Sequence, residues 1–279
     1  MNQADKKQLI AMATEIRKGA VEAVHSAKSG HPGGSLSASD ILTYLYFKGM
    51  NIDPQDPKNP DRDRLVLSKG HVCPGYYSTL AHRGYFSTEE LKGFRQIGYM
   101  LQGHPDMKKI PGVDFSAGSL GQGVSAACGM ALAGKLDNKD YNVFAICGDG
   151  EIQEGQIWEA AMFAGAKKLD NLCVFVDNNN LQIDGTVEEV NSPYPIDAKF
   201  AAFNFHVITI DGHDFDQIEA AVEEFKTVSG KPTAIIAKTV KGKGVSFMEN
   251  NVGWHGKAPN DEQYEIAMND LNAILAEVK

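Results

Sequence analysis

Residues 141–155, "YNVFAICGDGEIQEG", decide the fold, because an apolar run ends in a carboxylate, Asp149, between two glycines. The apolar run predicts a buried strand, and "QIWEAAMFAGAKKL" (156–169) after it predicts a helix. A second apolar run, "NLCVFV" (171–176), ends in "DNNN" (177–180). Strand, helix and strand in this order form a βαβ unit, whose right-handed crossover makes the two strands parallel. We therefore expect both carboxyl ends at one edge of a sheet.

Three further apolar runs extend this pattern, and they occupy residues 64–68, 206–210 and 233–240. Helical segments separate the strands, which is typical of a parallel sheet covered on both faces. We predict an α/β fold with three αβα layers and a mostly parallel sheet. No repeat, low-complexity tract or linker interrupts residues 1–279, so we expect a single domain.

The remaining segments give additional helices and one turn. Apolar residues at helical spacing predict a helix over 9–24, and "GHPGGS" (30–35) predicts a glycine-rich turn. Helices are also expected over 37–49 and 261–278. The stretch "GQGVSAACGMALAGKL" (121–136) predicts a helix of small residues that packs closely against neighbouring backbone.

The composition excludes several classes of function. The 279 residues are 43% hydrophobic with a net charge of −9 and no basic run, which argues against nucleic acid and membrane partners. No apolar run reaches the roughly 20 residues of a membrane span, and no signal peptide precedes the first helix. The four cysteines (Cys73, Cys128, Cys147, Cys173) form no CxxC pair. Reduced cysteines in a cytoplasmic protein fit best.

Asp149 and the asparagines 178–180 predict a metal site at the sheet edge. Carboxylate and amide oxygens suit Mg²⁺ or Ca²⁺ shared with a phosphate ligand, and the glycines allow backbone N–H groups to approach that phosphate. The alternative is a capped turn beside an asparagine-rich loop, but the pairing of the two strand ends favours the metal. No Walker A pattern occurs, and "GQGVSA" (121–126) lacks the preceding strand of a dinucleotide site.

Seven motifs occur in an order that resembles the transketolase family and cover nearly the whole chain: "KSGHPGGSLSASD", "LSKGH", "GHPD", "SAGSLGQG", "GDGEIQEGQIWEA", "DNNNLQIDG" and "WHGKAP". The resemblance is to the N-terminal, diphosphate-binding part of a transketolase, and it implies the thiamine diphosphate-binding fold. The pyrimidine and C-terminal domains of single-chain relatives are absent from these 279 residues. The sequence thus resembles the N-terminal subunit of a split transketolase.

The resemblance also implies a role for individual residues. It assigns Mg²⁺, or Ca²⁺ in its place, to the side chains of Asp149 and Asn179 and the backbone oxygen of Leu181. It implies that His71, Gly150 and His255 contact the diphosphate of the cofactor. Ile183 is implied to pack on the thiazolium side, and Gly118 and Leu120 to flank the aminopyrimidine. It also implies that Glu154 belongs to an acidic cluster near the dimer interface, and that Glu159 belongs to a carboxylate network that links the two active sites. The role of Ser119 stays open.

The histidines fall into two groups. His31, His71, His104 and His255 lie in the motifs, and the resemblance implies that they line the substrate channel, where imidazoles can exchange protons with sugar hydroxyls. The others (His25, His82, His206, His213) lie outside the motifs and are interpreted as surface or core residues. Lys241, in "KTVKGKG", is a candidate diphosphate ligand, with a solvated loop lysine as the alternative.

The implied activity is transfer of a two-carbon ketol unit from a ketose to an aldose acceptor, with thiamine diphosphate and Mg²⁺. The implied partner is a pyrimidine-domain subunit in an α2β2 heterotetramer, which supplies the glutamate that bonds the aminopyrimidine ring. One alternative is half of a 2-oxo acid dehydrogenase or deoxyxylulose phosphate synthase. The other is a non-catalytic binding or regulatory relative. The sugar stays open among pentose phosphates, branched-sugar phosphates and sulfonated sugars.

Overall fold

A computed structural model describes residues 1–278, and a parallel sheet with five strands forms the centre of this part of the chain. The strands lie in the order β1-β2-β3-β5-β4, and every neighbouring pair is parallel. Their bounds are β1 Arg64–Leu67, β2 Val143–Gly148, β3 Leu172–Asn178, β4 His206–Asp211 and β5 Thr233–Lys238. The five apolar runs of the sequence thus all form strands.

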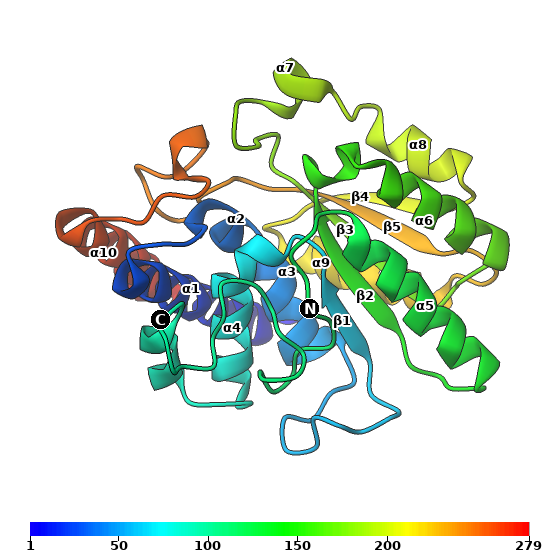
Figure 1. Cartoon of the computed structure of the whole chain (residues 1–279), viewed down its shortest axis with the longest axis horizontal. Coiled ribbons are helices and arrows are strands. Elements are labelled where there is room, and N and C mark those ends of the chain that lie inside the picture. The colour runs from blue at the N-terminus through cyan, green and yellow to red at the C-terminus, as the bar shows by residue number, and fades with distance from the viewer. Residues whose placement is uncertain (279) are drawn as a thin grey trace.

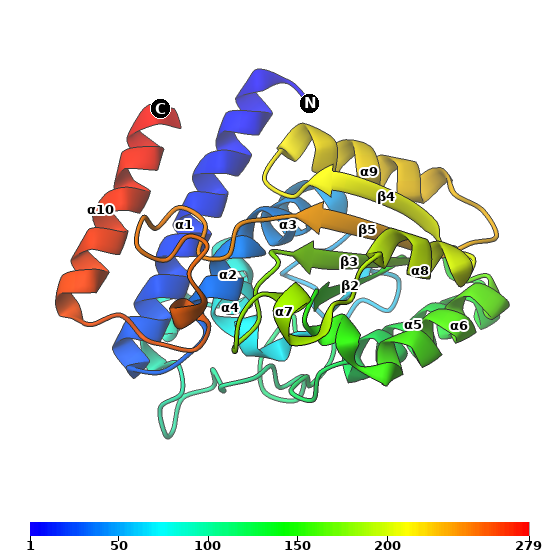
Figure 2. The same ribbon diagram turned by 90° about the horizontal axis from the view of Figure 1, so that it is seen from above.

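Helices cover both faces of the sheet, which gives the three layers that Figure 2 shows from above. On one face lie α5 (Gln122–Leu136), α6 (Gly155–Lys167) and α8 (Ile196–Ala202). The other face is covered by α3 (Ser39–Tyr44) and α9 (Phe215–Thr227), with further helices outside them. The fold class predicted from the sequence is confirmed.

The outer helices extend the second face beyond the edge of the sheet. Helix α1 (Gln3–Ala27) packs against α4 (Cys73–Arg83) and α10 (Asp261–Val278), so the first and last helices lie side by side (Figures 1 and 2). The short helices α2 (Pro32–Ser37) and α7 (Val187–Asn191) lie near the carboxyl ends of the strands. No helix within residues 1–278 has the length and apolar character needed to cross a membrane.

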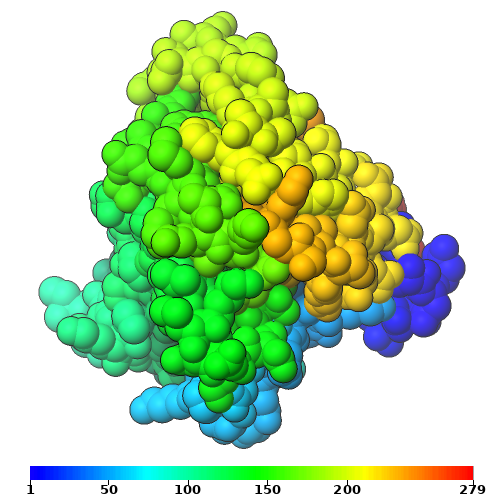
Figure 3. Space-filling model, turned by 90° about the vertical axis from the view of Figure 1, so that its right-hand side faces the viewer, coloured from blue at the N-terminus to red at the C-terminus, as the bar shows by residue number. Residues whose placement is uncertain are grey.

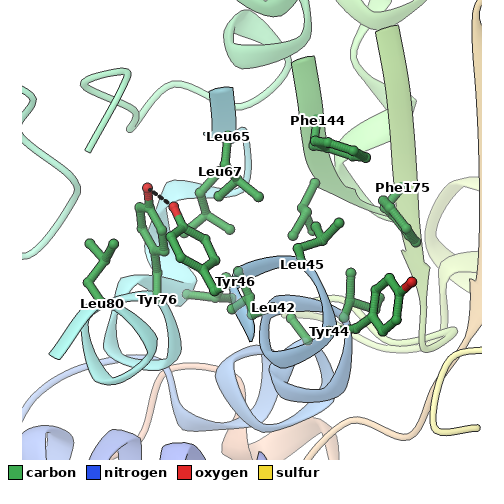
Figure 4. Packing of buried hydrophobic residues seen from close by; sticks show 14 of the residues in the cluster. Leu42, Tyr44, Leu45, Tyr46, Leu65, Leu67, Tyr76, Leu80, Phe144 and Phe175 are labelled. Atoms are coloured by element: carbon green, nitrogen blue, oxygen red, sulfur yellow. Dashed lines mark hydrogen bonds between the residues drawn. The ribbon is translucent and has the colours of Figure 1, made fainter. Parts of the chain in front are cut away.

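Aromatic and aliphatic side chains fill the space between the sheet and the second helical face. Figure 4 shows Phe144 and Phe175 on β2 and β3 above side chains of the α3 segment. The hydroxyls of Tyr46 and Tyr76 lie 3.0 Å apart in this core, so each buried phenol has a hydrogen-bond partner. The core fixes the sheet against α3 and α4, and it thereby places the loops at the strand ends.

One local prediction was wrong, and two others differ from the structure only in detail. Residues 32–37 form helix α2 instead of a glycine-rich turn, because Pro32 at the first helical position favours helix entry and Gly34 packs closely on Val72. The helix predicted over 156–169 is confirmed as α6, which begins at Gly155 after a 3₁₀ turn at Glu151–Gln153. The helix over 37–49 ends in a π-helical turn at Leu45–Gly49.

The face at the opposite end of the sheet, where the strands begin, is shown in Figure 3. Its surface is formed by the green and yellow segments around α5, α6 and α8, with the light-blue loop before β1 at one edge. The carboxyl ends of the strands point away from this face, toward α2 and α7 (Figure 2). Ligands of open α/β sheets bind at the carboxyl ends, so the candidate site is expected there.

Gly165 provides a test of the packing of α6. A Cβ at this position would lie 1.9 Å from the backbone oxygen of Phe203, which cannot move aside without shifting the chain. We predict that Gly165→Ala lowers the free energy of unfolding by about 1–3 kcal/mol, measured by chemical denaturation. The control is Gly129→Ala on α5, where nothing lies within 4 Å of the added carbon. This variant should be neutral or up to about 1 kcal/mol more stable, and equal losses in the two variants would contradict the packing argument.

Candidate active site

A cavity of about 380 Å³ lies at the carboxyl ends of the strands. Lys241 lines it, and so does every residue to which the family resemblance gave a catalytic, cofactor or metal role: His31, His71, His104, Gly118, Leu120, Asp149, Gly150, Glu154, Asn179, Leu181, Ile183 and His255. Asn178 and Asn180, which the strand pattern also placed at the metal site, are not in the lining and donate hydrogen bonds to Asp149 instead. Glu159 instead lies in a separate surface depression between α5 and α6. Segments distant in the sequence therefore meet in one cavity, and the roles of their residues are considered below.

Asp149 is a buried carboxylate at the end of β2, with 2% of its surface exposed. It accepts hydrogen bonds from the Asn178 side chain at 2.9 Å and from the Asn180 backbone N–H, so the ends of β2 and β3 converge as expected. Burial raises the pKa of Asp149 to about 6, although the Asn178 hydrogen bond opposes this. No cation within residues 1–278 forms an ion pair with it. Such a carboxylate is suited to a bound cation.

The oxygens near Asp149 fit a divalent cation. The side-chain oxygen of Asn179 accepts a hydrogen bond from the Leu181 N–H at 3.1 Å, and the Leu181 carbonyl faces the Lys241 ammonium at 3.1 Å. Nowhere in residues 1–278 do three His, Cys, Asp or Glu side chains cluster as a metal site. The donor set is thus one carboxylate with amide and carbonyl oxygens, which suits a hard cation that also binds phosphate.

The two glycines beside Asp149 leave room for neighbouring side chains. A Cβ on Gly148 would lie 3.5 Å from the Lys69 side chain, which passes over this position. A Cβ on Gly150 would lie 3.1 Å from the Cβ of Gln182. The capped-turn alternative is not supported, since α6 begins after Glu154, and no side chain caps that helix.

Two buried lysines approach the same region of the cavity. Lys69 forms an ion pair with Asp177, a fully buried carboxylate that also accepts a hydrogen bond from Ser37 at 2.6 Å. Lys241 is only 2% exposed and forms no ion pair among the described residues; its ammonium contacts Leu181 O and the Nδ1 atom of His255 at 2.8 Å. The interpretation of Lys241 as a solvated loop residue is therefore wrong. Burial and the nearby Lys69 lower the pKa of Lys241 to about 8.

Three histidines form a cluster beside Lys241. The ring centroids of His31, His71 and His255 lie 5.1–5.5 Å apart. Burial lowers the pKa of His31 to about 4 and that of His255 to about 3, and it lowers the pKa of His71 well below 6.5. These rings are therefore neutral near pH 7, and each can donate one hydrogen bond and accept another. The Nδ1 atom of His31 is buried and has no hydrogen-bond partner among residues 1–278.

The outer part of the cavity is exposed. His104 lies at the rim beside Gly118, and burial together with Arg95 lowers its pKa. Ile183, an apolar residue with 62% of its surface exposed, lies on the same rim. The cavity thus combines a charged, buried interior with an open side.

Several lining residues were not anticipated from the sequence: Gly34, Lys69, Gly148, Glu151, Gln153 and Gln182. All six lie inside stretches that were quoted as motifs, so position in a motif was the available signal. Glu151 is 3% exposed and accepts backbone hydrogen bonds from Gly121 at 2.9 Å and Gly148 at 3.0 Å. It therefore holds the start of α5 against the end of β2.

The model for "Transketolase, thiamine diphosphate binding domain" matches residues 8–272. The chain is 48% identical over 259 residues to the 6-deoxy-6-sulfo-D-fructose transketolase subunit SqwG of Clostridium sp. (strain MSTE9), which covers 93% of this chain and 94% of that protein. It is 42% identical over 263 residues to one subunit of the apulose-4-phosphate transketolase of Phocaeicola vulgatus, covering 94% of this chain and 93% of that protein.

Full-length transketolases are longer than this chain. Human transketolase is 41% identical over 260 residues, which are 91% of this chain and 41% of that protein. The crystal structure of Campylobacter jejuni transketolase superposes with a TM-score of 0.89 at 34% identity, covering 98% of this chain and 46% of that one. The chain spans less than half the length of these relatives.

The lowered pKa values predict how stability depends on pH. The pKa of His31 is about 6.5 in the unfolded chain and about 4 in the folded chain. Between these pH values the unfolded chain binds a proton at His31 and the folded chain does not, so the free energy of unfolding falls as the pH falls. We predict that His31→Gln makes the unfolding temperature depend less steeply on pH over this range, as measured by calorimetry. His206→Gln, at a partly exposed ring on β4, serves as the control. Identical pH profiles for wild type and His31→Gln would contradict the burial argument.

Proposed function

The chain belongs to the transketolase family through its thiamine diphosphate-binding domain, and we propose that it works as one subunit of a split transketolase. In this proposal the enzyme transfers a two-carbon ketol unit from a ketose to an aldose acceptor, with thiamine diphosphate and Mg²⁺ bound in the cavity. The observation that carries the proposal is the pair of buried, unpaired opposite charges, Asp149 and Lys241, beside three neutral histidines.

The two charges match the two charged parts of a metal diphosphate. In the proposal, Asp149, Asn179 and the Leu181 carbonyl hold Mg²⁺, or Ca²⁺ in its place. Lys241 contacts the diphosphate as a cation, and His71, Gly150 and His255 lie against the same group. Binding would give each buried charge an opposite partner, so it would remove the electrostatic cost that both bear in the isolated chain.

Bound thiamine diphosphate would supply the electron sink for breaking the carbon–carbon bond of the donor sugar. The chain's own residues bind and orient the substrate. Neutral imidazoles at His31, His71 and His255 can donate to one sugar hydroxyl and accept from another, and His104 reaches incoming sugar at the rim. Gly118, Leu120 and Ile183 would contact the rings of the cofactor.

A second subunit is part of the proposal, because two relatives of similar length are named as subunits. A pyrimidine-domain subunit would cover the open side of the cavity, where Ile183 is exposed. A second copy of this chain would pack across α5 and α6, where Met162 and Phe163 are 61% and 39% exposed beside the depression that contains Glu159. Glu154, on the rim of the cavity, would approach that interface. The assembly is then an α2β2 heterotetramer.

The donor sugar is left to experiment within the ketose class. The two relatives are named for a sulfonated sugar and a branched-sugar phosphate, and a solved transketolase structure contains xylulose 5-phosphate. We also propose a cytoplasmic location, which the four free, buried cysteines support. The alternatives among other thiamine enzymes are not favoured, because the family match spans residues 8–272.

Reconstitution tests the function as a whole. The chain is purified with and without the subunit that co-purifies with it, and ketol transfer is measured with thiamine diphosphate, Mg²⁺ and the three classes of ketose. We expect turnover only in the complex. Robust turnover by the chain alone would contradict the split enzyme, and a complex that fails to bind thiamine diphosphate would contradict the proposed function itself.

Two substitutions separate cofactor binding from substrate handling. Asp149→Ala should abolish Mg²⁺-dependent binding of thiamine diphosphate to the complex, measured by titration calorimetry, because it removes the anionic metal ligand. His104→Ala should bind the cofactor normally but turn over roughly 10²–10⁴-fold more slowly, the usual range for general acid–base groups. Wild-type cofactor affinity in Asp149→Ala would disprove the metal assignment. Wild-type kinetics in His104→Ala would show that this residue has no part in substrate handling.

A further inference from the structure

His213 lies in the loop after β4, outside the motifs that line the cavity, yet both of its ring nitrogens are bonded. Its Nε2 atom accepts a hydrogen bond from the Val240 backbone N–H at 2.8 Å. Because Nε2 is the acceptor, it carries no proton, and Nδ1 is the nitrogen that donates to Asp40 Oδ2 at 2.6 Å. The imidazole thus connects a carboxylate to the backbone immediately before Lys241.

A buried ion pair fixes the other side of this imidazole. The guanidinium of Arg17 on α1 binds both carboxylate oxygens of Asp40 on α3, and its Nε donates to Leu36 O at 3.1 Å. Asp40 and Arg17 are 4% and 5% exposed. Burial alone would raise the pKa of Asp40, but Arg17 and His213 outweigh it and lower the pKa, so the carboxylate stays charged. His213 is therefore held in one tautomer and one orientation.

The segment that His213 contacts is fixed at several points along its backbone. The Thr239 N–H donates to Asn178 O at 3.2 Å, and the Gly242 N–H donates to Gly33 O at 2.9 Å. Lys241 lies between these anchors, and its carbonyl accepts from the Asn250 N–H at 2.9 Å. The other three hydrogen bonds join backbone to backbone, whereas the Val240 N–H donates to a side chain, that of His213.

We propose that His213 is a positioning residue for Lys241 and, through it, for the diphosphate end of the cofactor; this rests on the proposed function. The lysine side chain has four flexible bonds, so its ammonium reaches Leu181 O and His255 Nδ1 only when its backbone is fixed. Loss of the acceptor removes the one contact that orients the peptide directly before Lys241, although the flanking backbone bonds of Thr239 and Gly242 remain. The network Arg17–Asp40–His213 thus connects α1 and α3 to the cation in the cavity.

Two substitutions at His213 isolate the hydrogen bond to Val240. In His213→Gln the longer side chain can place its oxygen near the position of Nε2, so the acceptor is retained. In His213→Asn the amide can still donate to Asp40, but its side chain is too short to reach Val240. We expect His213→Asn to weaken binding of thiamine diphosphate with Mg²⁺ to the complex roughly tenfold, and His213→Gln to restore most of the affinity.

A double-mutant cycle distinguishes positioning from a general loss of stability. If His213 acts through Lys241, His213→Asn should cause no further loss of affinity in a Lys241→Met background. His206→Asn, at the start of the strand that precedes His213, is the control and should bind the cofactor like wild type. Unfolding temperatures of all variants are measured in parallel, so that affinities are compared only among folded proteins.

Each result bears on the proposal. An equal tenfold loss of cofactor affinity from His213→Asn in the wild-type and Lys241→Met backgrounds would overturn it. Wild-type affinity in His213→Asn would also overturn it, and so would equal losses of affinity in His213→Gln and His213→Asn. A failure of the wild-type complex to bind thiamine diphosphate would refute the proposed function, and it is measured separately in the same titrations.

Discussion

The buried ion pair between Lys69 and Asp177 joins the carboxyl ends of β1 and β3 across β2. Its geometry depends on the parallel register, which places Gly148 of β2 directly beside Asp177. The Lys69 side chain passes close over position 148, where a Cβ would lie 3.5 Å from it. Removing either partner would leave an uncompensated charge in the protein interior, at a cost of several kcal/mol. The two other buried charges of the cavity, Asp149 and Lys241, lie near this pair.

Asp149 and Lys241 differ from that pair because neither has an opposite charge within ion-pair distance in the described chain. Folding alone would not favour these two buried charges, since each bears a desolvation cost that attraction to more distant charges offsets only in part. Proteins accept such costs chiefly at sites where a ligand supplies the missing partner. The unpaired charges therefore argue for a ligand more strongly than the cavity volume does.

The neutral state of the three clustered histidines depends on the same buried charges. Burial keeps His31, His71 and His255 neutral, and the neighbouring lysines reinforce the effect by repelling a further positive charge. Neutral rings retain both a donor and an acceptor nitrogen, as a polyhydroxylated substrate requires. Lys241, which would bind the anionic cofactor, also helps to keep the imidazoles neutral, so one buried cation serves both purposes.

The sequence by itself determined the five strands, their parallel arrangement and the residues that meet at the strand ends, because apolar runs and the βαβ pattern are local and the crossover has one hand. It did not determine that residues 32–37 are helical, since two glycines predict a turn until packing on Val72 is considered. Nor did it determine that Lys241 is buried or that His213 contacts Val240. Those properties depend on groups from distant segments, and only the tertiary structure decided which charges are paired, which imidazoles are neutral and which backbone positions are fixed.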